Sequence, residues 1–321
     1  MRWPLSRFLP DHSHINFVRL SPFAAVLSVL AVIGSIVCFA TLGLNLGIDF
    51  KGGTVIEAVT PGPAPLAQYR AALEHMGLRD SQVQGFGAAN DALLKFQPLS
   101  ADPSAAVDAV NGVKAKLASE FPGVQFPSTQ VVGPKVSGEL FRSGFMALGL
   151  AILLMLVYIG FRFGLQQGLG AILAIFHDVL LTIGLLSAMQ IEFSMTSIAA
   201  LLTVIGYSMN EKVITFDRLR ENLGKYRRTP LSEVINLSEN ERLSRTIITG
   251  ATALLALGGM LFLSGPSLFP LAFTMVFGIL IGTYSSVYVA LPVLLIWGVK
   301  RGEDDAPKPT QKSGKPATAR P

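Results

Sequence analysis

The chain has 321 residues, of which 50% are hydrophobic and 15% are charged, and its formal net charge is +5. This composition is typical of a multispanning membrane protein and argues against a nucleic-acid-binding surface, which needs clustered basic and aromatic residues. The single cysteine, Cys38, lies in an apolar run and excludes an internal disulfide.

The first predicted elements are a polar N-terminal segment, residues 1–21, and a membrane span, residues 22–46. The span carries no charge and exceeds the length of a signal-peptide core. No small-x-small cleavage site is evident after it. We therefore expect a span that is retained in the protein.

The next segment, residues 47–138, is charged, interrupted by proline and of mixed periodicity. Its patterns predict strands and amphipathic helices in the order β-α-β-β-α-β. That order is typical of a small α+β domain with ferredoxin-like topology. His75 stands alone in it, and no metal-ligand cluster or nucleotide-binding glycine pattern is present. We expect flexible attachments at its two ends, at Gly52, Gly53, Gly133 and Pro134.

Five further apolar segments follow, each of about 20 residues. They are residues 144–161, 169–191, 196–216, 246–264 and 269–297. With the first span they predict six transmembrane helices, five of them in a bundle formed by residues 139–298.

Lysine and arginine gather in the connection of residues 217–245 and at the start of the tail, whereas the connections near residues 190–193 and 265–269 have none. The positive-inside rule then places both termini and this basic loop in the cytoplasm. The domain after the first span faces the other side. The tail, residues 299–321, is too poor in apolar residues to fold, so we predict that it is disordered.

The fourth predicted span carries Asn210, Glu211 and Lys212 inside an apolar helix. Thr203 and Tyr207 lie on the same helix face as Glu211, because four-residue steps share a face. A charge at the centre of a bilayer costs about 2.5–3.5 kcal/mol, so Glu211 is expected to face a protein interior or a water path. In the alternative, Glu211 lies near the headgroups and Lys212 snorkels towards them.

Polar residues recur in two other spans: His177 and Asp178 in the third, and Arg245, followed by Thr249, at the start of the fifth. We predict that Asp178, Glu211 and Arg245 form a cluster that exchanges protons. Two alternatives remain: His177 as a hydrogen-bonded core histidine and Arg245 as a positive-inside anchor. Two glycine pairs have the GxxxG spacing of closely packed helices, Gly164/Gly168 and Gly278/Gly282.

Six motifs along the chain resemble, in order, those of the SecF family of protein-export membrane subunits, which belongs to the SecD/SecF group and is related to the resistance-nodulation-division transporters. The motifs are GLNLGIDFKGGT from residue 43, VVGPKVSGEL from 131, FRF followed by AIFHDV, GYSMNEKVITFDRLREN from 206, LSRTIIT from 243 and GTYSSVYVALP from 282. Asp49, Gly52 and Gly53 lie in the first motif. The resemblance covers residues 42–297.

The resemblance implies a multi-pass protein of the bacterial inner membrane with a periplasmic domain after the first span. It implies that the chain pairs with SecD, associates with the SecYEG channel and handles unfolded preprotein after the ATP-driven step, with YajC and YidC as further candidate partners. The resemblance implies the proton, or sodium as in some bacteria, as the coupling ion, and no other cofactor. The family's ion-pathway acid falls at Glu211, its membrane arginine at Arg245, and Asp178 matches the HDV motif.

One motif departs from the family pattern Asn-Asp-Thr-Val, because this chain reads Asn210-Glu211-Lys212-Val213. Two other functions remain open: an independent ion-coupled transporter, and a passive scaffold whose charges only hold helices together. An enzyme is not expected, because the sequence has no zinc motif, no nucleophile paired with a base and no paired-aspartate protease signature.

Overall fold

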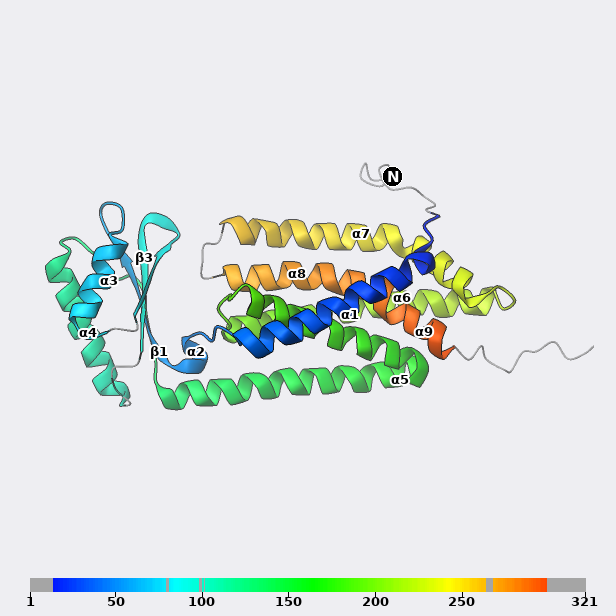
Figure 1. Ribbon diagram of the computed structural model, residues 1–321, viewed down its shortest axis with the longest axis horizontal. Helices are drawn as coiled ribbons and strands as arrows, with labels where there is room; N and C mark the ends of the chain where they lie inside the picture. The colour runs from blue at the N-terminus through cyan, green and yellow to red at the C-terminus, as the bar shows by residue number, and fades with distance from the viewer. Residues whose placement is uncertain (1–13, 79–80, 98–99, 101, 264–267, 299–321) are drawn as a thin grey trace, which may run out of the picture.

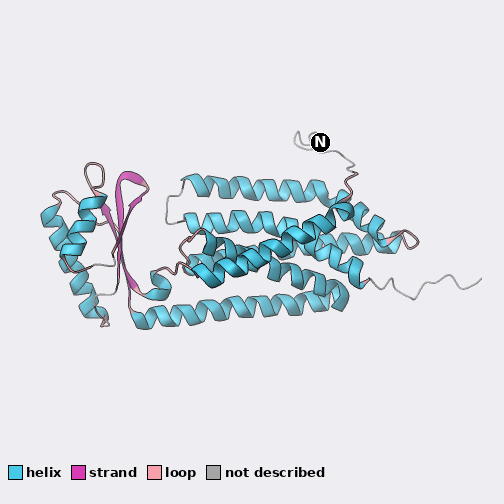
Figure 2. Ribbon diagram, in the orientation of Figure 1, coloured by secondary structure: helices cyan, strands magenta, loops and turns pink. Residues whose placement is uncertain are grey.

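The computed structural model describes residues 14–78, 81–97, 100, 102–263 and 268–298. The molecule is elongated, with a small α+β domain at one end and a long helical bundle at the other (Figures 1 and 2). The predicted N-terminal segment lies mostly outside the described residues, and the predicted tail, residues 299–321, lies wholly outside them.

The bundle consists of α1 Phe17–Leu42, α5 Pro134–Ala188, α6 Met195–Lys225, α7 Leu231–Leu263, α8 Phe269–Ser285, a π-helical turn Ser286–Ala290 (η2) and α9 Leu291–Trp297. Five segments of the described chain are long and apolar enough to span a membrane: Phe17–Leu42, Pro134–Gly164, Gly168–Ala188, Leu231–Leu263 and Phe269–Trp297. The prediction of a polytopic helical membrane protein is therefore confirmed. The fourth predicted span lies in α6, which is not among the five.

The first helix begins earlier and ends earlier than predicted. It starts at Phe17, where the Asn16 side chain accepts a hydrogen bond from the Arg19 backbone nitrogen at 3.0 Å, and Pro22 lies within its first turns. It ends at Leu42 because Gly43, with φ +65°, takes a left-handed conformation that a helix cannot continue.

The second and third predicted spans are the two helical segments of α5, Pro134–Gly164 and Gly168–Ala188, separated by a sharp break at Gly164, where φ is +73° and ψ is 174°. A Cβ added at Gly164 would meet no atom within 4 Å. The GxxxG interpretation of Gly164 is therefore wrong, since this glycine makes a turn and not a close helix contact. The helix also begins at Pro134, inside the range predicted for the soluble domain.

The predicted basic loop of residues 217–245 is mostly helical, which corrects the sequence-based interpretation. The α6 helix continues to Lys225 and α7 begins at Leu231, so the turn between them is only residues 226–230. Beyond their apolar parts, the two helices are joined by an ion pair between Arg218 Nε and Glu241 Oε2 at 2.7 Å.

The small domain has a four-stranded antiparallel sheet with strand order β2-β3-β1-β4. Its elements are β1 Gly53–Val59, α3 Leu66–His75, β2 Gln82–Phe86, β3 Ala88–Phe96, α4 Pro103–Glu120 and β4 Thr129–Val132. Both helices lie on the sheet face that points away from the bundle (Figure 1). Ile56, Tyr69, Leu73, Leu94 and Leu117 are fully buried between the layers.

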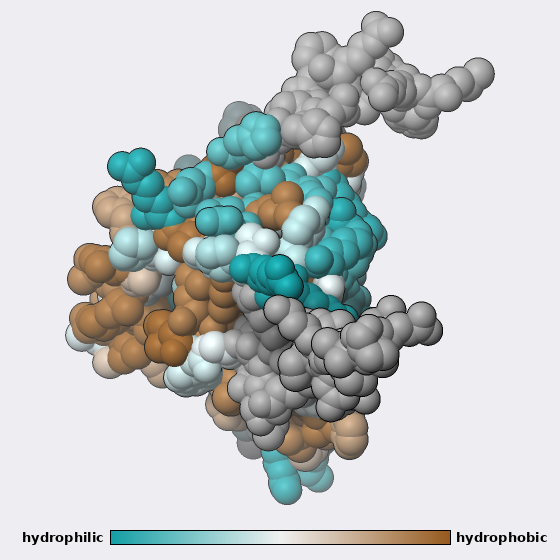
Figure 3. All heavy atoms as spheres, turned by 90° about the vertical axis from the view of Figure 1, so that its right-hand side faces the viewer, coloured by the Kyte–Doolittle hydropathy of each residue, from teal (hydrophilic) through white to brown (hydrophobic). Residues whose placement is uncertain are grey.

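The bundle has two distinct ends. The start of α1, the turn between α6 and α7 and the end of α9 lie together at the end remote from the small domain (Figure 1). Figure 3 looks onto this end and shows hydrophilic residues across much of it, beside a hydrophobic flank. This polar end fits a surface that faces water.

The α8 helix packs against α6 through the second glycine pair, as predicted. A Cβ added at Gly278 would lie 2.2 Å from Val204 Cγ2, and one added at Gly282 would lie 2.9 Å from Ser208 Cβ. The close approach brings the C-terminal end of α8 and η2 against the charged part of α6.

We expect Gly278→Ala to destabilise the protein by about 1–3 kcal/mol, because the new methyl group overpacks the contact with Val204. The matched control is Gly258→Ala in α7, where an added Cβ meets nothing within 4 Å. Thermal unfolding of the detergent-purified variants measures the difference. Equal stability of the two variants would contradict the close packing.

Candidate functional site

The centre of the bundle is α6, which packs against α5, α7 and α8. Glu211 and Lys212 are 1% and 0% exposed, so both charged side chains lie in the protein interior. Because neighbouring residues on a helix point about 100° apart, the two side chains enter different parts of the core. The alternative in which Lys212 snorkels to the headgroups is therefore wrong.

Lys212 forms a buried ion pair with Asp178 of α5, with Nζ 2.8 Å from Oδ2. Ser208 and Ser285 donate hydrogen bonds to the same carboxylate oxygen at 2.5 and 2.8 Å. The ammonium group also donates to both of these hydroxyls. Asp178 and Lys212 are thus paired with each other, and both are hydrogen-bonded to Ser208 of α6 and Ser285 of α8.

His177 contacts the other oxygen of this carboxylate, with Nδ1 3.0 Å from Asp178 Oδ1. Its ring is buried and stacks on Tyr284 of α8 at a centroid distance of 6.2 Å. The geometry favours the interpretation of His177 as a core histidine that orients Asp178.

Glu211 points into a second cluster, formed with α7 and η2. Its Oε2 accepts hydrogen bonds from Arg242 Nη1 at 3.3 Å and from Thr246 Oγ1 at 3.1 Å. Arg242 also makes a two-pronged contact with Glu239, from Nε to Oε1 at 2.8 Å and from Nη2 to Oε2 at 2.6 Å. Ser286 accepts a further bond from Arg242 at 3.0 Å. All three charged side chains are at most 4% exposed.

The structure corrects the predicted partner of Glu211. Arg242 occupies the place predicted for Arg245, which is exposed and one turn further along α7. At 100° per residue, positions 239, 242 and 246 lie within about 60° of one another around the helix, whereas position 245 lies about 90° from the centre of that face. The predicted trio is thus only partly brought together: Asp178 and Glu211 lie in adjacent clusters, and Arg245 lies in neither.

The other predicted polar residues surround the clusters without joining them. Thr203 and Asn210 are exposed on α6, and Tyr207 and Thr249 are half-buried. Thr203 donates its hydroxyl to its own helix, at Ala199 O. Thr203 and Asn210 thus lie on the outer side of α6, whereas the Tyr207 hydroxyl is buried.

A polar cavity of about 450 Å³ opens between α6 and α7 and reaches Arg242. Its walls are charged and include Asp217, Arg218, Glu241 and Arg245. It approaches the Glu211 cluster from the part of α6 and α7 nearest the 226–230 turn. Water in this cavity would reach the guanidinium from that end of the bundle.

Several residues of the two clusters were missed by sequence reasoning. They are Ser208, Glu239, Arg242, Thr246, Ser285 and Ser286. Glu239 and Arg242 carried a usable signal, because a Glu and an Arg three apart form an ion pair on a helix. The interpretation of residues 217–245 as a loop hid that spacing.

The segment before the small domain joins the domain to the bundle. Asp49, in the short helix α2 Ile48–Lys51, accepts a hydrogen bond from the Met195 backbone nitrogen at 2.9 Å and so caps α6. Gly52 and Gly53 follow with positive φ values of 73° and 149°. Gly133 caps α5 with an extended backbone, and Pro134 is the first residue of that helix.

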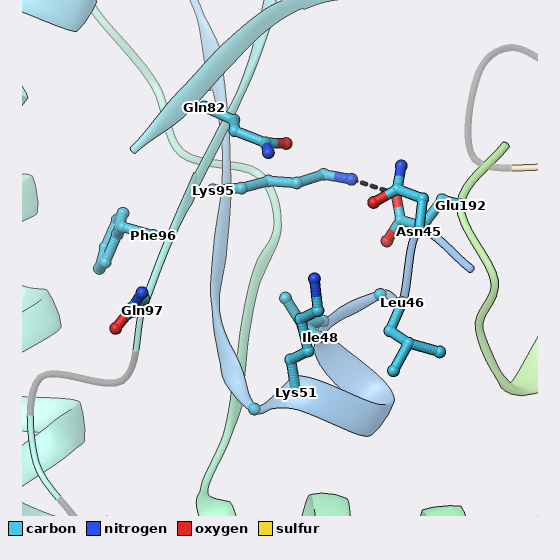
Figure 4. A pocket seen from close by; sticks show the side chains of 11 residues that line it. Asn45, Leu46, Ile48, Lys51, Gln82, Lys95, Phe96, Gln97 and Glu192 are labelled. Atoms are coloured by element: carbon cyan, nitrogen blue, oxygen red, sulfur yellow. Dashed lines mark hydrogen bonds and ion pairs between the residues drawn. The ribbon is translucent and has the colours of Figure 1, made fainter. Parts of the chain in front are cut away.

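A second polar cavity, of about 510 Å³, lies between this segment and the sheet. Figure 4 shows Lys95 of β3 reaching across it to an ion pair with Glu192, in the connection between α5 and α6. Asn45, Lys51 and Gln82 line the same space. The ion pair links the small domain directly to the bundle.

Residues 112–300 match the family described as protein export membrane protein SecD/SecF, C-terminal, and residues 39–58 match the SecD/SecF GG motif. The first match covers more than half of the chain. The chain belongs to the SecD/SecF family. The GG segment that caps α6 and the clusters around α6 both lie within the matched residues.

The relatives and solved structures agree with this assignment. The protein translocase subunit SecF of Cereibacter sphaeroides is 44% identical over 96% of each chain, and that of Rhodobacter capsulatus is 41% identical over 93% of each. The SecDF crystal structure from Thermus thermophilus matches with a TM-score of 0.81 and 32% identity. A SecDF structure in the super-membrane-facing form gives 0.67 and 33%. The match covers 92% of this chain and 40% of each SecDF chain.

Proposed function

We propose that this chain is a SecF-type subunit of a protein translocase that works with a SecD subunit and uses the proton motive force to complete preprotein translocation. The observation that carries the proposal is Glu211, a carboxylate buried at the centre of a membrane bundle beside a charged cavity. Intramembrane acids in such positions mark ion pathways. A passive scaffold does not require a titratable acid at this position.

In the proposed mechanism Glu211 takes up a proton from one side of the membrane and releases it to the other. Arg242 and Thr246 stabilise its ionised form through hydrogen bonds to Oε2. Asp178 and Lys212 form the neighbouring fixed pair. Each change in the charge of Glu211 alters the contacts between α6 and α7, and these movements reach the small domain through the cap of α6 at Asp49.

The proposal includes a bacterial inner-membrane location, six spans with α6 as the fourth, and a periplasmic domain of ferredoxin-like topology. The strand order β2-β3-β1-β4 and the position of the helices on one sheet face support that topology. The SecYEG channel, YajC, YidC and unfolded preprotein are the proposed partners. Weakening the link between Lys95 and Glu192 would let the domain move over Gly52 and Gly53.

The proposed orientation is tested by reporter fusions. A fusion at Asn90 is expected to report the periplasm and one at Pro230 the cytoplasm, because the basic turn between α6 and α7 is held inside. A cytoplasmic signal at Asn90 would overturn the orientation.

The function is tested with the purified chain and its SecD subunit. The two are expected to purify together, and preprotein export into inverted membrane vesicles should rise when a proton gradient is added. Replacement of sodium by potassium separates the two coupling ions, and stimulation should persist. Export that does not respond to either ion gradient would leave only the scaffold function.

A further inference from the structure

The buried charges of the two clusters are not equally balanced. Asp178 and Lys212 form one carboxylate–ammonium pair. The neighbouring cluster places two carboxylates, Glu211 and Glu239, around the single guanidinium of Arg242. One carboxylate of this trio is therefore in excess. An uncompensated charge in a protein interior is unfavourable, so the trio is the place where one proton completes the charge balance.

The two carboxylates do not share Arg242 equally. Glu239 has the two-pronged contact, at 2.8 and 2.6 Å, whereas Glu211 has one contact at 3.3 Å. Parallel two-pronged Arg–carboxylate bonds are the stronger and more specific arrangement. Glu239 therefore holds the guanidinium, and Glu211 is left with one long charged contact and the Thr246 hydroxyl.

We propose that Glu239 is a positioning residue which binds Arg242 and so sets the pH at which Glu211 takes up its proton. This inference rests on the proposed function of Glu211 and assigns a role to a residue on a different helix. Because Glu239 makes the two-pronged contact, it competes with Glu211 for the positive charge of Arg242. The three-residue spacing of Glu239 and Arg242 on α7 keeps the pair together during exchange.

The other charged and titratable side chains around the trio come from every neighbouring helix. They include Asp178 and His177 on α5, Tyr207 and Lys212 on α6, and Tyr288 on η2. Asp217, Arg218, Glu221, Glu241 and Arg245 line the cavity that reaches Arg242. Lys212 is paired with Asp178. Arg242 is therefore the cation whose distribution between two acids decides where the proton binds.

The test measures gradient-stimulated export against pH for the complex with SecD. In Glu239→Gln, Arg242 has Glu211 as its only carboxylate partner in the trio, so a lower pH is needed to protonate Glu211. The pH profile of gradient-stimulated export should therefore move to lower pH by about one unit or more, which corresponds to a tenfold change in proton affinity. Glu239→Asp keeps the charge and should return the profile towards that of the wild type. Arg242→Gln, which removes the cation, should move it to higher pH.

Infrared difference spectra of the purified complex supply a second measurement, because a protonated buried carboxyl has its own absorption band. The pH at which this band appears should shift in Glu239→Gln in the same direction as export. If that variant does not assemble, the double variant Glu239→Gln with Arg242→Gln removes the ion pair as a unit, and its band should persist to higher pH than in the wild type.

If Glu239→Gln lowers export by the same factor at every pH and the profile does not shift, Glu239 is only structural and the proposal is overturned. An unchanged position of the infrared band would do the same. Failure of the proposed function gives a different result: a proton gradient would then stimulate export by neither the wild type nor Glu211→Gln. In that case the infrared titration still decides the role of Glu239.

Discussion

Glu211→Gln is expected to leave the complex with SecD intact and to abolish the gradient-stimulated part of export. Glutamine keeps the volume and can still accept hydrogen bonds from Arg242 and Thr246, but it cannot exchange a proton. The ATP-driven part of export should continue. The measurement compares export into inverted vesicles with and without a proton gradient.

Two variants control this experiment. Glu221→Gln changes an exposed carboxylate on the same helix, paired with Arg218 and Lys225 at the protein surface, and should keep full stimulation. Glu211→Asp retains a titratable group and should keep activity. Full stimulation by Glu211→Gln would refute its role as the proton carrier.

Arg242→Met is expected to have the largest effect on folding. It leaves Glu211 and Glu239 buried without their shared cation, and breaking a buried pair by removing one partner typically costs about 3–5 kcal/mol. Thermal unfolding of the detergent-purified protein and its yield in complex with SecD measure the loss. Gradient-stimulated export should fall with them.

Arg245→Met is the matched control, because it removes the same charge from the same helix at an exposed position. Its effect on stability should be below about 1 kcal/mol, the range of exposed charges. If Arg245→Met destabilises the isolated chain more than Arg242→Met, the assignment of Arg242 as the partner of Glu211 is wrong.

Much of the fold could be predicted because membrane spans and soluble strands leave strong local patterns. The uncharged run before Gly43 and the alternation around Ile56 each determine an element independently of the rest of the chain. The ends of the helices were less predictable. The polar residues between 161 and 169 indicated an interruption, but the turn at Gly164 depends on a left-handed backbone angle that the sequence pattern does not specify.

The candidate site could be predicted only in part, for a physical reason. A carboxylate in an apolar helix is conspicuous, so Glu211 and Asp178 were found. Their partners depend on which faces of different helices meet, and a charged stretch such as residues 239–245 is equally compatible with a solvated loop. The pairing of Asp178 with Lys212 joins residues 34 apart, and that choice is made by packing against Ser208 and Ser285.

The most direct test of a proton-carrying Glu211 follows protons themselves. The complex with SecD is reconstituted with the translocation channel in vesicles that hold a pH-sensitive dye, and internal pH is recorded while preprotein is exported. Wild type and Glu211→Asp should show proton movement that depends on export, and Glu211→Gln should show none. Equal proton movement in the wild type and Glu211→Gln would contradict the account.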